Sequence, residues 1–166
     1  MLNYWPRGGM VDTKDLKSLP YGSAGSSPAE ATKVLLKGIN YMFAFVTIGA
    51  NDLKSSAKFY DKILLPFDIV KVDSDERYVG YANINYPEKI ELYIMKPYNK
   101  KAASIGNGTM ITFLADSTKI VDQFHAIGLE NGGVDEGSPG PRHGTDYYAY
   151  VRDLDGNKIC AYSNIR

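Results

Sequence analysis

The feature of this 166-residue sequence that most constrains its fold is one pattern of segments that occurs twice. Residues 43–49 are rich in aromatic and β-branched types, which predicts a strand, and apolar residues at helical spacing follow it. A shift of 65 residues matches Thr47 with Thr112 and Phe59 with Phe124. The second segment therefore repeats the strand and the helix of the first, which indicates an internal duplication.

Each half continues into further strands, and these define the repeated unit. Strand candidates follow the first helical segment at about 67–73, 77–84 and 89–95. At the far end, Lys89–Tyr93 is similar to Lys158–Tyr162 at an offset of 69. The sequence thus predicts two βαβββ units, about 42–95 and 109–164, whose sheets can pair and curl around a shared cavity.

Residues 1–41 differ in composition from the body of the chain, residues 42–166. Clusters of Gly, Pro and Ser interrupt any helix or strand period there, so we predict an irregular leader in which only residues 28–37 form a short helix. Residues 9–18 also resemble conceptual translations of transfer-RNA genes. Two interpretations stay open: a non-native extension, or a real tail that packs poorly on the body.

Charge and cysteine content exclude several function classes. Lys plus Arg and Asp plus Glu both number 19, so the net charge of zero argues against a nucleic-acid partner. Cys160 is the only cysteine, which excludes an internal disulfide and favours a reducing, cytoplasmic location. No apolar run reaches the ~18 residues of a membrane span, and no secretory signal begins the sequence, so we expect no membrane partner.

Three segments carry a resemblance to a known family: Val46–Leu53, Phe59–Leu64 and Tyr147–Ile159. They are similar to the vicinal oxygen chelate superfamily, which holds glyoxalase I, bleomycin-resistance proteins and extradiol dioxygenases. The resemblance covers Met42 to about Asn164. It implies an α+β fold in which two βαβββ units form a curved mixed β-sheet around a cleft. It also implies a homodimer with cups completed by both chains. One fold hosts many functions, so the motifs specify the fold better than the activity.

The resemblance also implies four positions for metal ligands. In the metal-using members these chelate one divalent cation, and here they are Phe45, Glu91, Met110 and Cys160. Phe45 has no donor atom, and Met110 offers only a thioether, a poor ligand for such metals. A catalytic metal needs about three protein ligands. We therefore predict no cofactor, and a divalent metal only if the site is shifted.

Several residues are candidates for chemistry, each with a structural alternative. Glu91 is either a buried general base with a raised pKa or a carboxylate neutralised by hydrogen bonds. Cys160 is either a nucleophile or a small hydrophobe. The segment Ser138–Asp146 predicts a loop beside the cavity. There Arg142 would bind an anionic group and His143 would move a proton, unless the loop is simply solvated.

Thirteen tyrosines are the last candidate feature. Tyr93, Tyr148 and Tyr150 fall on predicted strands, where phenol rings that line a cup suit flat organic ligands. Strand alternation places Tyr147 and Tyr148 on opposite faces, and the sequence leaves open which of them faces the cup.

The leading function is a metal-independent, small-molecule-binding protein that performs no chemistry. The alternative is a glyoxalase-like lyase or a dioxygenase that uses Glu91, His143 or a shifted metal site. A third possibility is an interaction module whose sheet face only dimerises.

Overall fold

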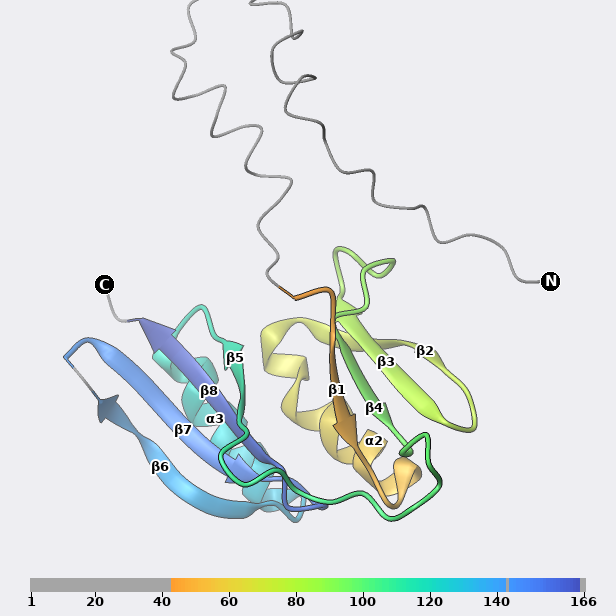
Figure 1. The fold of residues 1–166 in the computed structure, drawn as a ribbon. Helices are drawn as coiled ribbons and strands as arrows, with labels where there is room; N and C mark the ends of the chain where they lie inside the picture. Colours follow the sequence, from red (N-terminus) through yellow and green to blue (C-terminus); the bar gives the residue numbers. More distant parts are fainter. Residues whose placement is uncertain (1–42, 143, 165–166) are drawn as a thin grey trace, which may run out of the picture. The chain divides into compact units, whose positions relative to one another are not determined.

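The computed structural model describes residues 43–142 and 144–164; the predicted leader, with its short helix, and His143 lie outside the described residues. Two βαβββ units are present, as the repeat predicts, and the fold is α+β (Figure 1). The first unit comprises β1 (Val46–Gly49), α2 (Leu53–Ile63), the 3₁₀ helix η2 (Leu65–Phe67), β2 (Ile69–Ser74), β3 (Tyr78–Asn83) and β4 (Leu92–Met95). The second unit comprises β5 (Ile111–Leu114), α3 (Thr118–Glu130), β6 (Val134–Arg142), β7 (Asp146–Arg152) and β8 (Lys158–Asn164).

Each unit has its own four-stranded mixed sheet. The strand orders are β1-β4-β3-β2 and β5-β8-β7-β6. The first strand of each unit runs parallel to the last one, and the other neighbours are antiparallel. Within the described residues no strand ladder joins the two sheets. The duplicated sequence pattern therefore corresponds to a duplicated topology.

The two long helices begin at polar caps and bury one face. The Asp52 side chain accepts hydrogen bonds from the amides of Lys54 and Ser55 at the start of α2, and the Ser117 hydroxyl accepts one from Ile120 at the start of α3. The buried side chains of the two helices include Leu53, Phe59, Tyr60, Ile63, Val121 and Phe124. None of the described helices has the length and apolar character needed to cross a membrane.

The helix-bearing sides of the two units pack on each other. Helix α2 contacts α3, and the ring of Phe67 in η2 lies 5.9 Å from that of Phe113 and 6.0 Å from that of Phe124. Strand residues that share this core include Ile48, Val79, Leu92, Ile94, Ala149, Val151, Ile159 and Ala161. Because side chains alternate along a strand, the residues between these project from the opposite side of each sheet, on which none of the described helices packs. We call these two surfaces the first and the second open face.

The turn between β7 and β8 fastens the second unit to the first. Asp155 accepts hydrogen bonds from the amide of Asn51 (2.9 Å), its side chain (2.8 Å) and the hydroxyl of Ser56 (2.9 Å). Asp153 is 5% exposed and accepts a hydrogen bond of 2.7 Å from the buried hydroxyl of Tyr60. These long-range bonds fix the two units relative to each other.

One predicted loop is largely a strand. Residues Ser138–Arg142 belong to β6, and Asp146 begins β7, so the prediction of a loop over 138–146 was wrong for most of its length. β6 is the edge of its sheet, and its register with β7 shifts around Gly137. An edge strand with bulges tolerates Pro139 and Pro141, because a strand with a neighbour on one side only and an irregular register needs fewer N–H donors.

Candidate functional site

The second open face is lined by tyrosine rings. Ala149 and Val151 point into the core, so Tyr148 and Tyr150 project from the other side of β7. Their rings are stacked at 6.0 Å with an interplanar angle of 4°, and the ring of Tyr162 lies 4.9 Å from that of Tyr148. This arrangement answers the question that the sequence left open, which of two neighbouring tyrosines faces outward.

Tyr147 belongs to the opposite side. It packs against the core, and its hydroxyl donates a hydrogen bond of 2.9 Å to Asp122 of α3. Tyr148 is therefore the member of the pair that lies on the open face.

Cys160 lies on the same face beneath these rings. It pairs in register with Tyr150 of β7 and with Thr112 of β5, and none of its surface is exposed. Burial raises the pKa of its thiol to about 11. The thiol is therefore protonated at neutral pH, which favours the reading of Cys160 as a small hydrophobe over that of a nucleophile.

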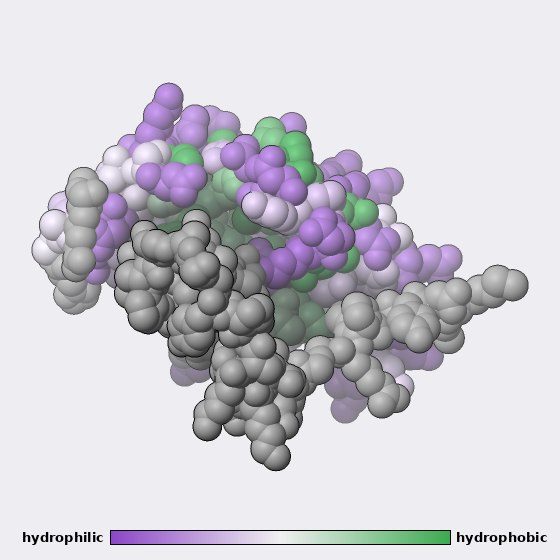
Figure 2. Space-filling model, turned by 90° about the horizontal axis from the view of Figure 1, so that it is seen from above, coloured by the Kyte–Doolittle hydropathy of each residue, from purple (hydrophilic) through white to green (hydrophobic). Residues whose placement is uncertain are grey.

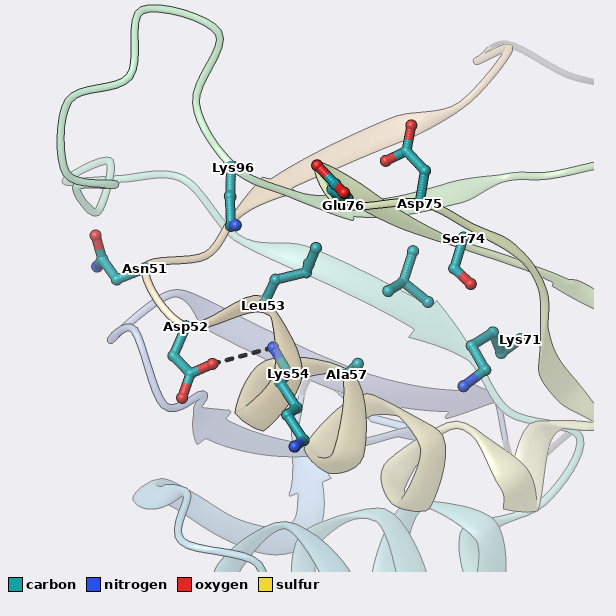
Figure 3. Close-up of a pocket in the computed structure, with 11 residues that line it drawn as sticks. Asn51, Asp52, Leu53, Lys54, Ala57, Lys71, Ser74, Asp75, Glu76 and Lys96 are labelled. Carbon is teal, nitrogen blue, oxygen red and sulfur yellow. Dashed lines mark hydrogen bonds between the residues drawn. The ribbon is translucent and has the colours of Figure 1, made fainter.

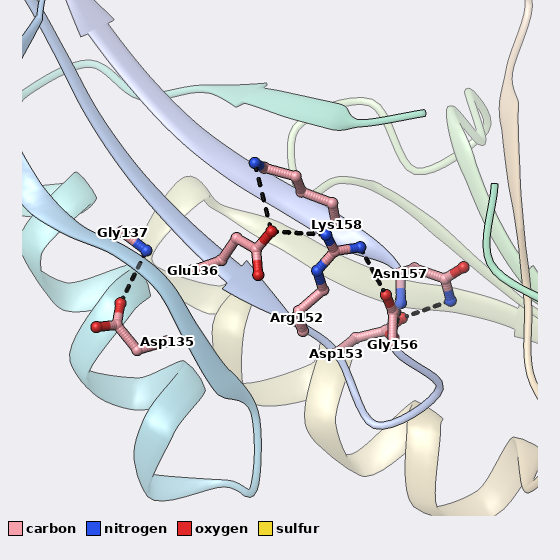
Figure 4. A network of polar contacts seen from close by, with 8 residues as sticks. All are labelled: Asp135, Glu136, Gly137, Arg152, Asp153, Gly156, Asn157 and Lys158. Carbon is pink, nitrogen blue, oxygen red and sulfur yellow. Dashed lines mark hydrogen bonds and ion pairs between the residues drawn. The ribbon is translucent and has the colours of Figure 1, made fainter. Parts of the chain in front are cut away.

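A charged cluster lies at one end of the second open face (Figure 4). Glu136 accepts a hydrogen bond of 2.6 Å from Arg152 and lies 3.6 Å from the ammonium group of Lys158. The Arg152 hydrogen bond is the main cause that lowers the pKa of Glu136. The Lys158 ammonium also stands 5.0 Å from the centroid of the Tyr150 ring. Two cations therefore share one carboxylate beside the tyrosines.

Sequence reasoning missed this cluster, although a signal was present. Arg152 and Lys158 flank the turn between β7 and β8, so an antiparallel hairpin places them opposite each other.

Arg142 stands near the same rings. Its guanidinium donates to the carbonyl oxygens of Pro141 (3.0 Å) and Ser138 (3.2 Å), and it makes no ion pair with any described carboxylate. Burial raises the pKa of Tyr150, and the charge of Arg142 opposes this shift, which places the two groups within electrostatic reach. Its expected partner in the loop, His143, lies outside the described residues.

The first open face carries a smaller aromatic group. The Tyr93 ring makes edge contacts with Phe45 at 5.3 Å and with Tyr78 at 5.5 Å. The hydroxyl of Tyr78 donates to Asp73 at 2.8 Å, and this bond is the main cause that raises the pKa of Tyr78 to about 12. The structure thus brings Phe45 and Tyr93 together on the first open face.

Glu91 is not the buried carboxylate that a general base with a raised pKa would require. Its side chain is 47% exposed, and its carboxylate lies 3.4 Å from the ammonium group of Lys89. It borders a recess of about 280 Å³ between the units, together with apolar side chains that include Val46, Leu92 and Phe113. Figure 2 shows hydrophobic surface in the hollowed middle of the face seen from above.

The four positions carried over from the metal-using relatives form two separate pairs. Phe45 and Glu91 precede β1 and β4 of one sheet, whereas Met110 and Cys160 belong to the other. Met110 is 40% exposed and borders a pocket of about 490 Å³ with Arg152 and Lys158.

The strand register also changes which residue of the second unit is equivalent to Glu91 of the first. Val46 pairs with Leu92, and the equivalent Ile111 pairs with Ile159. In the ladder, the counterpart of Glu91 is therefore Lys158, two residues before Cys160 on the same side of β8.

These donors do not fit a divalent cation. Phe45 supplies no donor, the thiol of Cys160 is protonated, and Glu91 already has a cationic neighbour. The described part of the chain contains no group of three or more His, Cys, Asp or Glu side chains placed to hold a metal.

Comparison with known proteins identifies the family. The model of the Glyoxalase/Bleomycin resistance protein/Dioxygenase superfamily matches residues 42–161. The chain belongs to this superfamily. A glyoxalase/bleomycin resistance protein from Albidiferax ferrireducens is 40% identical, with a TM-score of 0.68 over 74% of this chain and 98% of that one. No curated protein matches the chain significantly.

More distant members of the superfamily share the fold. A glyoxalase-related enzyme from Fulvimarina pelagi is 19% identical, with a TM-score of 0.58, over 74% of this chain and 88% of its own. Lactoylglutathione lyase from Agrobacterium tumefaciens is 16% identical, with a TM-score of 0.57, over 76% of this chain and 96% of its own. At such identities the likeness concerns the fold alone.

Proposed function

We propose that this superfamily member is a cytoplasmic, metal-independent protein that binds a small organic molecule as a homodimer. The observation that carries the proposal is the pair of open faces lined by aromatic side chains, Phe45 and Tyr93 on one sheet and Tyr148 and Tyr150 on the other. In this proposal, the first open face of one protomer meets the second open face of its partner, and the two enclose the ligand.

The chemistry of the second open face supports a flat organic ligand. Tyrosine rings offer broad apolar contact together with hydroxyl groups that form hydrogen bonds. Tyr148 and Tyr150 would contact the faces of the ligand, and Arg142 and Lys158 would bind polar or anionic substituents at its edges. The protonated thiol of Cys160 would add an unreactive floor to the cup.

A binding experiment tests this proposal. Bleomycin, a glycopeptide that carries a flat bithiazole group, is titrated calorimetrically into protein dialysed against a chelator, and sedimentation equilibrium gives the oligomeric state. We expect a dimer and saturable binding that weakens at least about tenfold in Tyr150→Ala. Tyr86→Ala, at a tyrosine 63% exposed outside the strands, is the matched control and should bind like the parent protein. A monomer, or equal losses in both variants, would contradict the proposal.

The enzymatic alternative is tested with the same material. The hemithioacetal of methylglyoxal and glutathione is offered to the protein loaded with Ni²⁺ or Zn²⁺. Turnover that disappears in Glu91→Gln would replace the binding function with a lyase function.

A further inference from the structure

A further pocket, bordered by neither Tyr148 nor Tyr150, is lined by cations. It has a volume of about 570 Å³ and is bordered by Arg77, Lys96, Lys100 and Lys101, with Ala50, Asn51, Pro97 and Ala102 completing its wall. We call it the basic pocket. No carboxylate residue borders it, although the chain as a whole carries no net charge.

The positive charges of the basic pocket are not neutralised by the protein. None of its four cationic side chains makes an ion pair with a described carboxylate. The Arg77 guanidinium instead lies 5.4 Å from the centroid of the exposed Tyr98 ring, a contact that orients the group and leaves its charge intact. Like charges around one concavity repel one another, and an anion bound among them relieves that repulsion.

Backbone contacts hold the loop that supplies three of these cations. The Asn51 side chain accepts a hydrogen bond from the Ala103 amide (2.8 Å) and donates one to the Ala103 carbonyl (3.4 Å). Gly49 leaves room for this contact, since a Cβ there would lie 3.1 Å from that of Ala103. At the other end of the loop, the Lys100 amide donates to the Pro97 carbonyl, and Lys100 takes a left-handed conformation with a φ of 61°. The lysines are thus presented from a fixed backbone.

An adjoining pocket carries acidic side chains (Figure 3). Asn51 and Lys96 line both pockets, whereas Asp52, Asp75 and Glu76 line only the adjoining one. Asp155 accepts a hydrogen bond from the Asn51 side chain but borders neither pocket. The two pockets therefore differ in charge, and an anion is favoured only in the basic one.

We propose that the basic pocket binds a small polyanion of the pyrophosphate type, free or as part of a larger phosphorylated molecule. Four cations match the three to four negative charges of such a group, and lysine and arginine both bind phosphate oxygens through charge-assisted hydrogen bonds. The site uses none of the residues of the two open faces, so it stands independently of the proposed function.

The test uses inorganic pyrophosphate as the probe, titrated calorimetrically into the full chain at constant ionic strength, with sulfate as the competing anion. We expect one pyrophosphate per chain, and binding that weakens as salt rises. The double substitution Lys100→Gln/Lys101→Gln should weaken it at least about tenfold. The control, Lys58→Gln/Lys62→Gln, removes two exposed lysines from α2 and should leave binding unchanged.

A third variant tests the proposal independently in case the Lys100→Gln/Lys101→Gln variant folds poorly. Arg77→Gln changes a side chain of the pocket that lies outside the loop, and it should also weaken binding. Absence of saturable binding to the parent chain overturns the proposal. So does an equal loss in the loop and control variants, or displacement by sulfate at equal concentration, because each indicates screening by overall charge rather than a site.

Discussion

Removal of one buried hydroxyl group should destabilise the whole body of the protein. Tyr60 on α2 is fully buried, and its hydroxyl donates a hydrogen bond of 2.7 Å to Asp153, which is 5% exposed. The same carboxylate accepts bonds from the side chain and the amide of Asn157 and from the amide of Asp155. In Tyr60→Phe the ring remains, and the carboxylate loses the only one of these donors that comes from the first unit.

The size of the effect follows from the charge and the burial of the acceptor. A hydrogen bond to a charged group contributes about 1.5–3 kcal/mol, and its loss leaves part of a buried carboxylate unsatisfied. We therefore expect Tyr60→Phe to lower the free energy of unfolding by about 2 kcal/mol. For a chain of this size the thermal midpoint should fall by roughly 4–8 °C. Burial, followed by the charge of Asp153, raises the pKa of Tyr60 well above its usual value, so its hydroxyl remains a donor throughout the neutral range.

Urea unfolding followed by circular dichroism measures this difference, and Tyr147→Phe is the matched control. Tyr147 makes the same type of bond to Asp122, but in an exposed setting, so its loss should cost less than about 0.5 kcal/mol. Equal losses in the two variants would refute the reasoning, because burial of the carboxylate is what separates them. A change in the slope of unfolding with urea would point instead to an altered unfolded state.

Three further outcomes are expected. Burial raises the pKa of Cys160 from about 9 to about 11, so at pH 8 the native thiol should react with a disulfide reagent at least about 100-fold more slowly than the unfolded thiol. Hydrogen bonds from His125 and the Gly137 amide lower the pKa of Asp135 below 3.8, so their contribution to stability is present above that pH and lost as pH falls through the folded-state pKa. Thermal midpoints measured at pH 6 and pH 3 should therefore differ less in Asp135→Asn than in the parent. Deletion of residues 1–41, which lack a periodic apolar face, should leave the thermal midpoint unchanged within about 8 °C.

The fold could be predicted because local patterns and the global topology agree. Helical spacing after a short strand occurs twice, and a duplicated unit limits the topologies that the chain can adopt. The edge strand β6 was missed because Pro139 and Pro141 are typical of loops. Its place at the edge of the sheet, where a missing N–H does no harm, depends on tertiary structure and has no local signature.

Which site residues lie close together was harder to predict than the helices and strands on which they lie. Similarity at an offset of 69 matches Glu91 with Cys160, whereas the ladders match it with Lys158. Sequence similarity aligns residues by side-chain type, whereas the ladder aligns them by backbone hydrogen bonds. Because the loops of the two units differ in length, the two alignments differ by two residues in the last strand. Of the two alternatives for Glu91, the buried general base disagrees with a side chain that is 47% exposed and lies 3.4 Å from the Lys89 ammonium group.

The orientation of the tyrosines was in fact encoded in their neighbours. Ala149 and Val151 are small enough to pack under α3, where Gly128 lies so near Val151 that a Cβ on it would stand 3.3 Å from that side chain. Where Gly128 of α3 lies this close to β7, only small side chains fit at positions 149 and 151, and strand alternation then places Tyr148 and Tyr150 on the other side. The alternation of small and aromatic residues along β7 thus makes the second open face aromatic. Large rings lie on the side of the sheet where none of the described helices packs, and this exposed aromatic surface is the feature on which the proposed binding function rests.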